Sequence, residues 1–159
     1  MIGIPGQTYE SLANDIDLFH KLDLDMIGVG PYISHPETPL GSKEWKRAIS
    51  EKDQVPNTEE MTYKVIALTR IVCPEANLPS TTALATLNTD HGRELGLIRG
   101  ANVVMPNLTP SQYRSKYEIY PAKACIKETL QDNYAALPPC IQSIGRKLGI
   151  GQGSRIRHS

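Results

Sequence analysis

The chain has 159 residues, the size of one ordinary domain that can bury a hydrophobic core. Its 17 basic and 17 acidic residues balance, which argues against nucleic acid or an anionic membrane surface as a partner. No apolar run is long enough for a transmembrane helix, no signal peptide is visible, and the three cysteines are too scattered for a disulfide framework, so we expect a cytoplasmic protein.

The first part of the chain alternates between short apolar runs and amphipathic segments. Residues 1–4 predict a strand that ends at a Pro-Gly turn, and Thr8 is typical of the N-cap of a helix, with apolar residues following at helical spacing. Residues 26–29 predict a second buried strand. The stretch 34–57 is rich in proline, glycine and charge, and it predicts a long loop.

A second helix is predicted to begin at residue 57 or 58. Met61, Val65 and Leu68 are expected to share its buried face, and Pro74 is expected to stop it.

The second half of the chain continues the alternation. Residues 81–87 predict a third strand, 91–99 a short helix, and 102–105 a fourth strand. Thr109 and the proline after it open a further helix, because proline is harmless at the first helical position. The last residues, 149–159, are rich in Gly, Ser and Arg and predict a loose tail.

Four strands, each followed by a helix, indicate about four parallel β/α units. An open set of four parallel strands leaves two unpaired edges, which a barrel of eight such units closes. We therefore expect an α/β chain in which residues 1–148 form half of a TIM-type β/α barrel, followed by a flexible tail at 149–159. A small doubly wound sheet is the alternative.

In a β/α barrel the active site lies at the carboxyl ends of the strands. Four segments occupy that position: residues 3–8, 28–40, 79–83 and 105–110. In the first, a tight βα turn is favoured over a ligand-binding loop. In the second, His35 is a possible ligand or base, although a lone loop histidine is more often simply solvated.

The fourth segment runs into three tyrosines that share one helical face, namely Tyr113, Tyr117 and Tyr120. Such a stripe is usually core or interface, but beyond a strand end the phenol groups can also bond a ligand. Cys73 is expected to be a small buried residue. Cys125 and Cys140 are isolated thiols, which by themselves do not form the usual kind of metal site. No catalytic residue is identified.

The same segments resemble the radical-SAM β/α-barrel enzymes, and within them the HydE-type maturases of the [FeFe] hydrogenases. Residues 1–8, MIGIPGQT, resemble the fifth barrel strand, and residues 30–40, GPYISHPETPL, resemble the sixth. Residues 67–71, 79–83 and 105–110, with Tyr-Arg at 113–114 and the YEIYP of 117–121, are most similar to HydE. The resemblance covers nearly the whole chain and implies the C-terminal half of such an enzyme.

This resemblance implies a cofactor and a substrate. In the family, a [4Fe–4S] cluster on a C-x3-C-x2-C loop reduces S-adenosylmethionine to a 5′-deoxyadenosyl radical, and HydE acts on an iron complex delivered by a partner maturase. Backbone around Ile4, Pro31, Tyr32 and Ile33 would line the adenosyl moiety. The substrate cavity would be lined by Thr81, Thr82, Met105, Asn107, Tyr117 and Tyr120.

The chain departs from the family in two places. It holds no C-x3-C-x2-C motif, so we expect it to be inactive alone and to need a missing N-terminal half. Cys125 and Cys140 match the outer two ligands of an accessory iron–sulfur cluster, but Leu137 stands at the third position, so that cluster is expected to be absent or unstable. The alternatives are a related methylornithine- or biotin-type synthase, or a non-catalytic half-barrel that binds a partner or small molecule.

Overall fold

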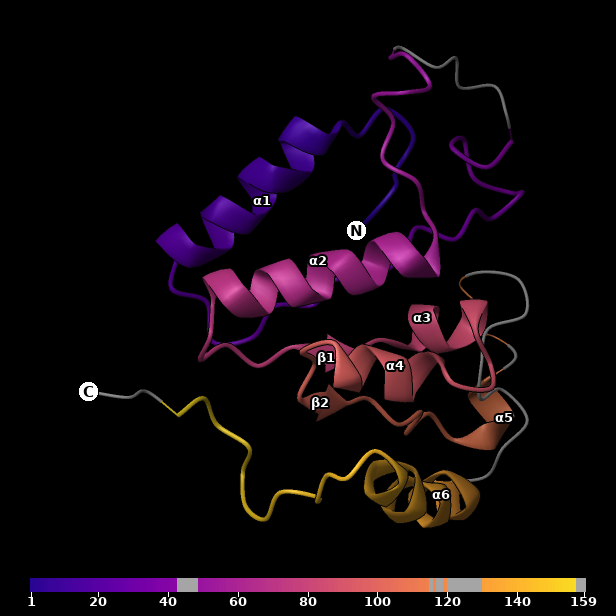
Figure 1. The fold of residues 1–159 in the computed structure, drawn as a ribbon. Coiled ribbons are helices and arrows are strands. Elements are labelled where there is room, and N and C mark those ends of the chain that lie inside the picture. The colour runs from indigo at the N-terminus through magenta and orange to yellow at the C-terminus, as the bar shows by residue number, and fades with distance from the viewer. Residues whose placement is uncertain (43–48, 115, 117–118, 120–129, 157–159) are drawn as a thin grey trace.

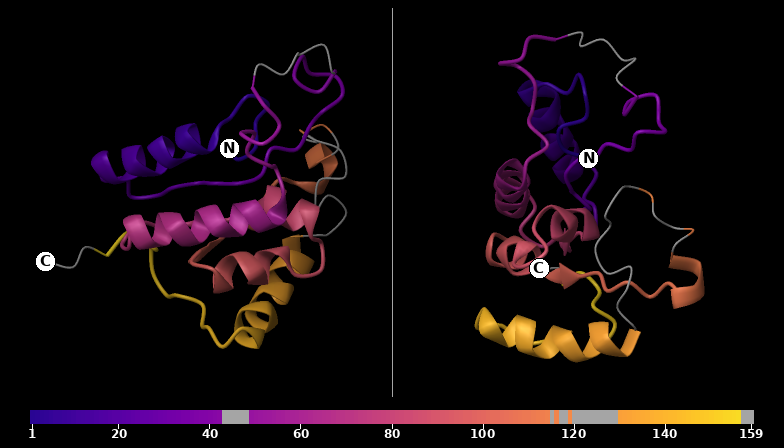
Figure 2. Two further views of the ribbon diagram at one scale, coloured as in Figure 1. Left: turned by 45° about the horizontal axis from the view of Figure 1, so that its top comes forward. Right: turned by 90° about the vertical axis from the view of Figure 1, so that its right-hand side faces the viewer.

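The structure is a computed structural model that describes residues 1–42, 49–114, 116, 119 and 130–156 (Figure 1). Its elements, in chain order, are α1 (Tyr9–Lys21), α2 (Glu59–Val72), β1 (Pro79–Ser80), α3 (Thr82–Leu87), α4 (Gly92–Ile98), β2 (Val103–Val104), α5 (Ser111–Arg114) and α6 (Leu130–Ser143). Helices α1, α2, α4 and α6 succeed one another from one end of the molecule to the other (Figures 1 and 2).

Parallel pairing links four segments in the order in which they occur in the chain. β1 and β2 form a two-stranded parallel sheet with Pro79 opposite Val103. Single parallel bridges join Ile2 to Pro31 and Met26 to Asn77. The prediction of four parallel segments is thus met in order and direction, but the regular strands are only two residues long. The half-barrel itself stays a prediction.

Threonine caps fix the first two helices where the sequence predicted them. The Thr8 hydroxyl accepts from the amide of Ser11 at 3.1 Å, and the Thr58 hydroxyl accepts from that of Met61 at 3.2 Å. Each bond satisfies an amide that the helix itself leaves unpaired.

The predicted buried face of α2 was partly wrong. Val65 is buried, but Leu68 is 51% exposed. The buried face consists of Thr62, Val65, Ile66 and Thr69, which follow the i, i+3, i+4, i+7 spacing. The buried face of α2 is therefore turned by about one residue from the predicted face. Two small threonines, Thr62 and Thr69, are buried there, whereas the sequence pattern favoured the larger Leu68.

The strand predicted at residues 81–87 is a helix. Strand β1 ends at Ser80, just before the predicted range begins. Helix α3 then begins at Thr82, with Thr81 as its N-cap. The Thr81 hydroxyl accepts from the amide of Leu84 at 3.4 Å, so the β-branched residues that suggested a strand instead start a helix. The helix predicted at 91–99 and the strand predicted at 102–105 are confirmed, since α4 and β2 lie within those ranges. The helix that Thr109 and the following proline were predicted to open is α5, which begins at Ser111.

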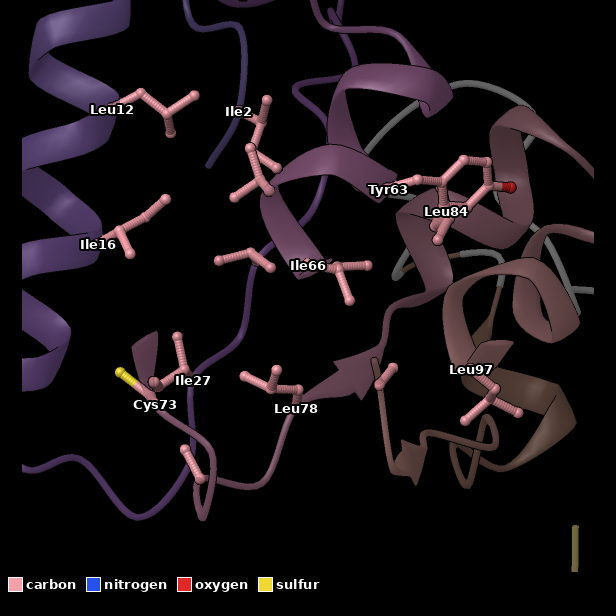
Figure 3. Close-up of a cluster of buried hydrophobic side chains, with 14 of the residues drawn as sticks. Ile2, Leu12, Ile16, Ile27, Tyr63, Ile66, Cys73, Leu78, Leu84 and Leu97 are labelled. Atoms are coloured by element: carbon pink, nitrogen blue, oxygen red, sulfur yellow. The ribbon is translucent and has the colours of Figure 1, made fainter. Parts of the chain in front are cut away.

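The core lies between the helices and the parallel segments (Figure 3). Leu12 and Ile16 reach it from α1, Ile66 from α2 and Leu78 from the position just before β1, and each is at most 8% exposed. Cys73 caps the end of α2 and is buried, as predicted.

The sequence analysis missed helix α6, which contains Pro138 and Pro139. Two consecutive prolines normally argue against a helix. The helix is nevertheless anchored, because Ile141 is buried in the core and Arg146, just beyond the helix, donates to the carbonyl of Ala101 at 2.8 Å. The boundary predicted between residues 148 and 149 stays a prediction.

None of the helices in the described ranges is long and apolar enough to cross a membrane.

Candidate functional site

A cavity of about 750 Å³ lies where the parallel segments end. Its walls come from the ends of segments 26–31 and 79–81, the first turn of α3 and the loop that follows residue 32. The lining residues are Met1, Gly28, Gly30, Pro31, Tyr32, Ile33, His35, Thr38, Pro39, Leu40, Thr81, Ala83 and Ile119. This is the end of the segments at which a β/α fold carries its site.

The cavity exists because side chains in an extended segment point alternately to opposite faces. Ile27 and Val29 point into the core and are 2% and 4% exposed. Gly28 and Gly30 fall on the opposite face and line the cavity. Because neither glycine has a side chain, the space beside this segment stays empty.

Gly30 and Thr81 meet closely across two neighbouring segments. A Cβ atom built on Gly30 would lie 2.8 Å from the Thr81 hydroxyl oxygen, whereas one on Gly28 would be 4.0 Å from Pro79. Glycine is thus required at position 30 by close approach. Thr81 in turn is held in place because its hydroxyl caps α3.

Tyr32 is fixed through its backbone and carries an unsatisfied hydroxyl. Its amide donates to the carbonyl of Ile2 at 2.7 Å, and its own carbonyl accepts from the side-chain amide of Asn57 at 2.8 Å. Its hydroxyl is buried and has no hydrogen-bond partner in the structure as described. Leaving a buried hydroxyl unpaired costs about 1–3 kcal/mol, so a hydrogen bond from a polar atom brought next to it would be stabilising.

His35 lines the cavity, and its backbone shapes the loop. Its Nδ1 accepts from the amide of Glu37 at 3.2 Å, which places the proton of the neutral ring on Nε2. Its carbonyl accepts from the amide and the hydroxyl of Thr38, at 3.1 and 2.8 Å. The imidazole therefore offers an N–H donor.

The turn at residues 3–8 is a tight βα turn, the reading that the sequence favoured. The amide of Gly3 donates to Gln7 Oε1 at 2.7 Å, and that of Gly6 donates to Gln54 Oε1 at 2.8 Å. Gln54 Nε2 also donates to the carbonyl of Ile4 at 3.1 Å. Two glutamine side chains thus occupy the backbone groups that a ligand would otherwise use.

Of the predicted site residues, the cavity brings together Pro31, Tyr32, Ile33 and Thr81. The following do not line it: Ile4, Thr82, Met105 and Asn107. Met105 is exposed, and Asn107 Oδ1 accepts from the amide of Thr109 at 3.1 Å. Tyr117, Tyr120 and Cys125 lie outside the described residues.

Several lining residues were not singled out in advance. Ala83 lies within the predicted segment 79–83, where only the threonines were assigned a role, and Ile119 lies between the two tyrosines, 117 and 120, that were assigned to the substrate cavity. Thr38, Pro39 and Leu40 belong to the predicted loop, but their sequence carries no signal for the side of the chain that faces the cavity.

The thiol of Cys140 is hydrogen-bonded to a carboxylate. Its thiol donates to Glu94 Oε1 at 3.2 Å, linking α6 to α4. Burial, and then the neighbouring Glu94 carboxylate, raise the pKa of this thiol to about 11. Within the part of the chain that the structure describes, no group of three or more His, Cys, Asp or Glu side chains is placed to hold a metal ion.

Comparison with known proteins shows which protein this chain resembles. No family model matches the chain. It is 41% identical over 157 residues to the "[FeFe] hydrogenase maturase subunit HydE" of Thermotoga maritima. That alignment takes in 99% of this chain and 42% of the relative, so the chain spans about two fifths of the length of the protein it matches. The resemblance predicted from the motifs is therefore confirmed: over nearly its whole length, the chain is similar to a C-terminal portion of a HydE-like protein.

Proposed function

We propose that this chain supplies the C-terminal portion of a HydE-like radical-SAM maturase, which helps to build the diiron centre of [FeFe] hydrogenase. The identity over almost the entire chain to a hydrogenase maturase subunit carries the proposal. The same observation favours a maturase over a methylornithine- or biotin-type synthase. In this proposal the four parallel segments form part of a barrel that the remainder of the protein completes.

The cavity is a suitable place for the adenosyl moiety of S-adenosylmethionine. Gly28 and Gly30 leave room for a flat ring beside the backbone, and Pro31 and Ile33 offer apolar surface. The unpaired hydroxyl of Tyr32 supplies a hydrogen bond to a ring nitrogen or a ribose hydroxyl. When bound, S-adenosylmethionine would supply the radical precursor, and these residues would hold and orient it.

The side of the cavity formed by β1 and α3 is the proposed entrance to the substrate site. Thr81 lines the wall there, and Thr82 opens α3 directly beside it. The proposed substrate is an iron complex passed on by another maturase. We propose that Met105, Asn107, Tyr117 and Tyr120 face this substrate once the barrel is complete.

An iron–sulfur cluster does not fit the two cysteines that the structure describes. Cys73 is buried in the core, and the Cys140 thiol is bonded to Glu94. A cluster needs thiolates in close groups. We therefore propose that the reducing cluster is held by the part of the protein that this chain does not span, and that the chain alone does not cleave S-adenosylmethionine.

A chimera tests the proposal directly. The matching 42% of the Thermotoga maritima maturase is replaced by this chain, and hydrogenase activity is measured after coexpression with the other maturases and the apo-hydrogenase. We expect the chimera to restore at least a tenth of the native maturation. A chimera that folds and binds S-adenosylmethionine but yields no active hydrogenase would contradict the maturase assignment and favour a related synthase.

A control variant separates cofactor binding from folding. In the chimera, Tyr32→Phe removes only the unpaired hydroxyl. We expect it to weaken S-adenosylmethionine binding by about tenfold, which is the loss of one hydrogen bond of about 1–1.5 kcal/mol, with thermal stability unchanged or improved. An unaltered affinity for S-adenosylmethionine would exclude the Tyr32 hydroxyl as a contact. The maturation result of the chimera would not be affected by that outcome.

A further inference from the structure

At the end of the molecule opposite the cavity, the guanidinium of Arg155 lies between two loops, residues 23–25 and the loop that contains Glu75. Arg155 Nη1 lies 2.6 Å from Asp23 Oδ1 and 3.8 Å from Asp25 Oδ1, and Nη2 lies 3.2 Å from Glu75 Oε2. The Arg155 side chain is only 12% exposed, although Asp23 and Asp25 are largely exposed. The group that binds this acidic end thus comes from residues 149–159, the segment that the sequence predicted to be loose.

Backbone contacts make this more than a surface ion pair. Arg155 Nη1 also donates to the carbonyls of Asp23 and Leu24, at 3.0 and 3.4 Å. Two residues earlier in the chain, the carbonyl of Gly153 accepts from Asn77 Nδ2 at 2.9 Å. Exposed ion pairs alone contribute little to stability, but here a planar donor joins carbonyls and carboxylates of the same loops.

The two loops lead directly into neighbouring parallel segments. Residues 23–25 precede segment 26–31, and Glu75 precedes segment 77–80. The segments are joined at this end by the Ile27 amide donating to the Asn77 carbonyl and the Asn77 amide donating to the Asp25 carbonyl, both at 2.9 Å. Arg155 binds the loops that carry these two bonds, and at the other end the cavity is lined by segment 26–31 and by Thr81, which follows segment 77–80.

The C-terminal segment also covers a recess at this end. Gly153, Ser154 and Ile156 line a hollow of about 330 Å³ together with Arg70 and Asn102. Figure 1 shows the yellow segment running to the side of the molecule where α1 and α2 end, away from the loop that follows residue 32. The segment therefore lies across the amino ends of the parallel segments.

We infer that residues 153–156 form a strap whose Arg155 guanidinium clamps the loops before segments 26–31 and 77–80 and keeps those two segments in register. The strap replaces the expected loose tail over these residues, and it acts on the cavity from the far end of its walls. It is independent of the ligand that the cavity holds.

Hydrogen exchange tests the strap on the full chain. In Arg155→Met, we expect the Ile27 and Asn77 amides to exchange about threefold to tenfold faster than in the unaltered chain, while the amides of α2 keep their rates. Lys147→Met removes the same charge from an exposed neighbouring position and is expected to change neither amide. Equal rates in Arg155→Met and the unaltered chain, or an equal rise in Lys147→Met, would overturn the strap.

A salt series on the unaltered chain tests the strap without a substitution, and so does not depend on whether Arg155→Met folds. Raising sodium chloride from 0.05 to 0.5 M, with the Debye length falling from about 14 to about 4 Å, weakens the clamp. We expect faster exchange at Ile27 and Asn77 and no matching change at the core amides of α2. Exchange at the two amides that does not respond to salt would count against the clamp.

Discussion

The backbone amide of Tyr32 donates to the carbonyl of Ile2 at 2.7 Å, and this bond connects the first segment of the chain to the wall of the cavity. The amide of Ile2 returns a bond of 2.9 Å to the carbonyl of Gly30. Ile2 is itself buried at 1% exposure. The position of the cavity-lining loop is therefore set by a residue at the very start of the chain, so core packing and site geometry are coupled.

Alanine at position 30 is expected to destabilise the chain, whereas alanine at position 28 is not. Gly30→Ala places a methyl group 2.8 Å from the Thr81 hydroxyl, so Thr81 has to move and weaken its cap. We expect a loss of about 1–2 kcal/mol in the free energy of unfolding, measured by urea denaturation. Gly28→Ala, whose nearest neighbour is 4.0 Å away, is the control and should change it by less than about 0.5 kcal/mol. Equal effects at the two positions would refute the close-approach argument.

Removing the Thr81 hydroxyl is expected to loosen α3. Thr81→Ala leaves the amide of Leu84 without its side-chain acceptor, and the loss of an N-cap costs about 0.5–2 kcal/mol. Circular dichroism during thermal unfolding measures this loss. Thr81→Ser keeps the hydroxyl and should retain most of the stability. If serine and alanine destabilise alike, the methyl group rather than the cap is what matters.

Arg70 is expected to be a main support of the loops at the amino ends of the segments. Its guanidinium donates to the carbonyls of Gly100, Pro74 and Ala76 and to Asn102 Oδ1, at 2.9, 2.7, 2.7 and 3.0 Å. Arg70→Met removes the donor from the three carbonyls, although Asn102 Oδ1 still accepts from the amide of Leu78 at 2.7 Å, and we expect about 2–3 kcal/mol of lost stability in urea.

The control for Arg70 is a lysine on the same helix. Lys64 forms an exposed pair with Glu60 at 2.8 Å, and Lys64→Met should cost less than about 0.5 kcal/mol. A loss for Arg70→Met as small as that for Lys64→Met would show that water replaces the carbonyl bonds without penalty.

Alkylation of Cys140 is expected to have an unusual pH dependence. Burial and the Glu94 carboxylate raise the pKa of this thiol to about 11, so iodoacetamide should label it slowly at pH 8–9 and faster as the pH approaches 11. Glu94→Gln removes the negative charge and should shift the profile to lower pH. Peptide mass spectrometry assigns the label to each cysteine. Half-maximal labelling at pH 8.5 in the folded chain would refute the raised pKa.

The same shift has a defined effect on stability. Because the pKa of Cys140 is higher in the folded chain than in the unfolded one, its stabilising contribution is fully present below the unfolded pKa of about 8.5. That contribution is lost as the pH rises from there through about 11. In Glu94→Gln, the decline in stability over this alkaline range should be shallower.

The sequence by itself determined the features that depend on local chemistry. Thr8 predicted where the first helix begins, and residues 57 and 58 were the two candidates for the start of the second, because a polar side chain at the N-cap satisfies an amide within the same turn. Apolar runs predicted the order of the parallel segments, and the motif resemblance identified the HydE-like character that the comparison confirmed. Segments 28–40 and 79–83 were expected at the carboxyl ends of strands, and Pro31, Tyr32, Ile33 and Thr81, which the resemblance assigned to the site, line the cavity.

Only the tertiary structure decided the features that depend on neighbours distant in the chain. Residues 81–87 have the composition of a strand, but the pairing partner, Val103–Val104, lies opposite Pro79–Ser80, so Thr81 is left to cap a helix. Leu68 is exposed because packing selected another face of α2. The contacts of Cys140 with Glu94 and of Arg155 with Asp23 span 46 and 132 residues of sequence. No local pattern encodes such contacts, since they form only when folding brings the separate segments together.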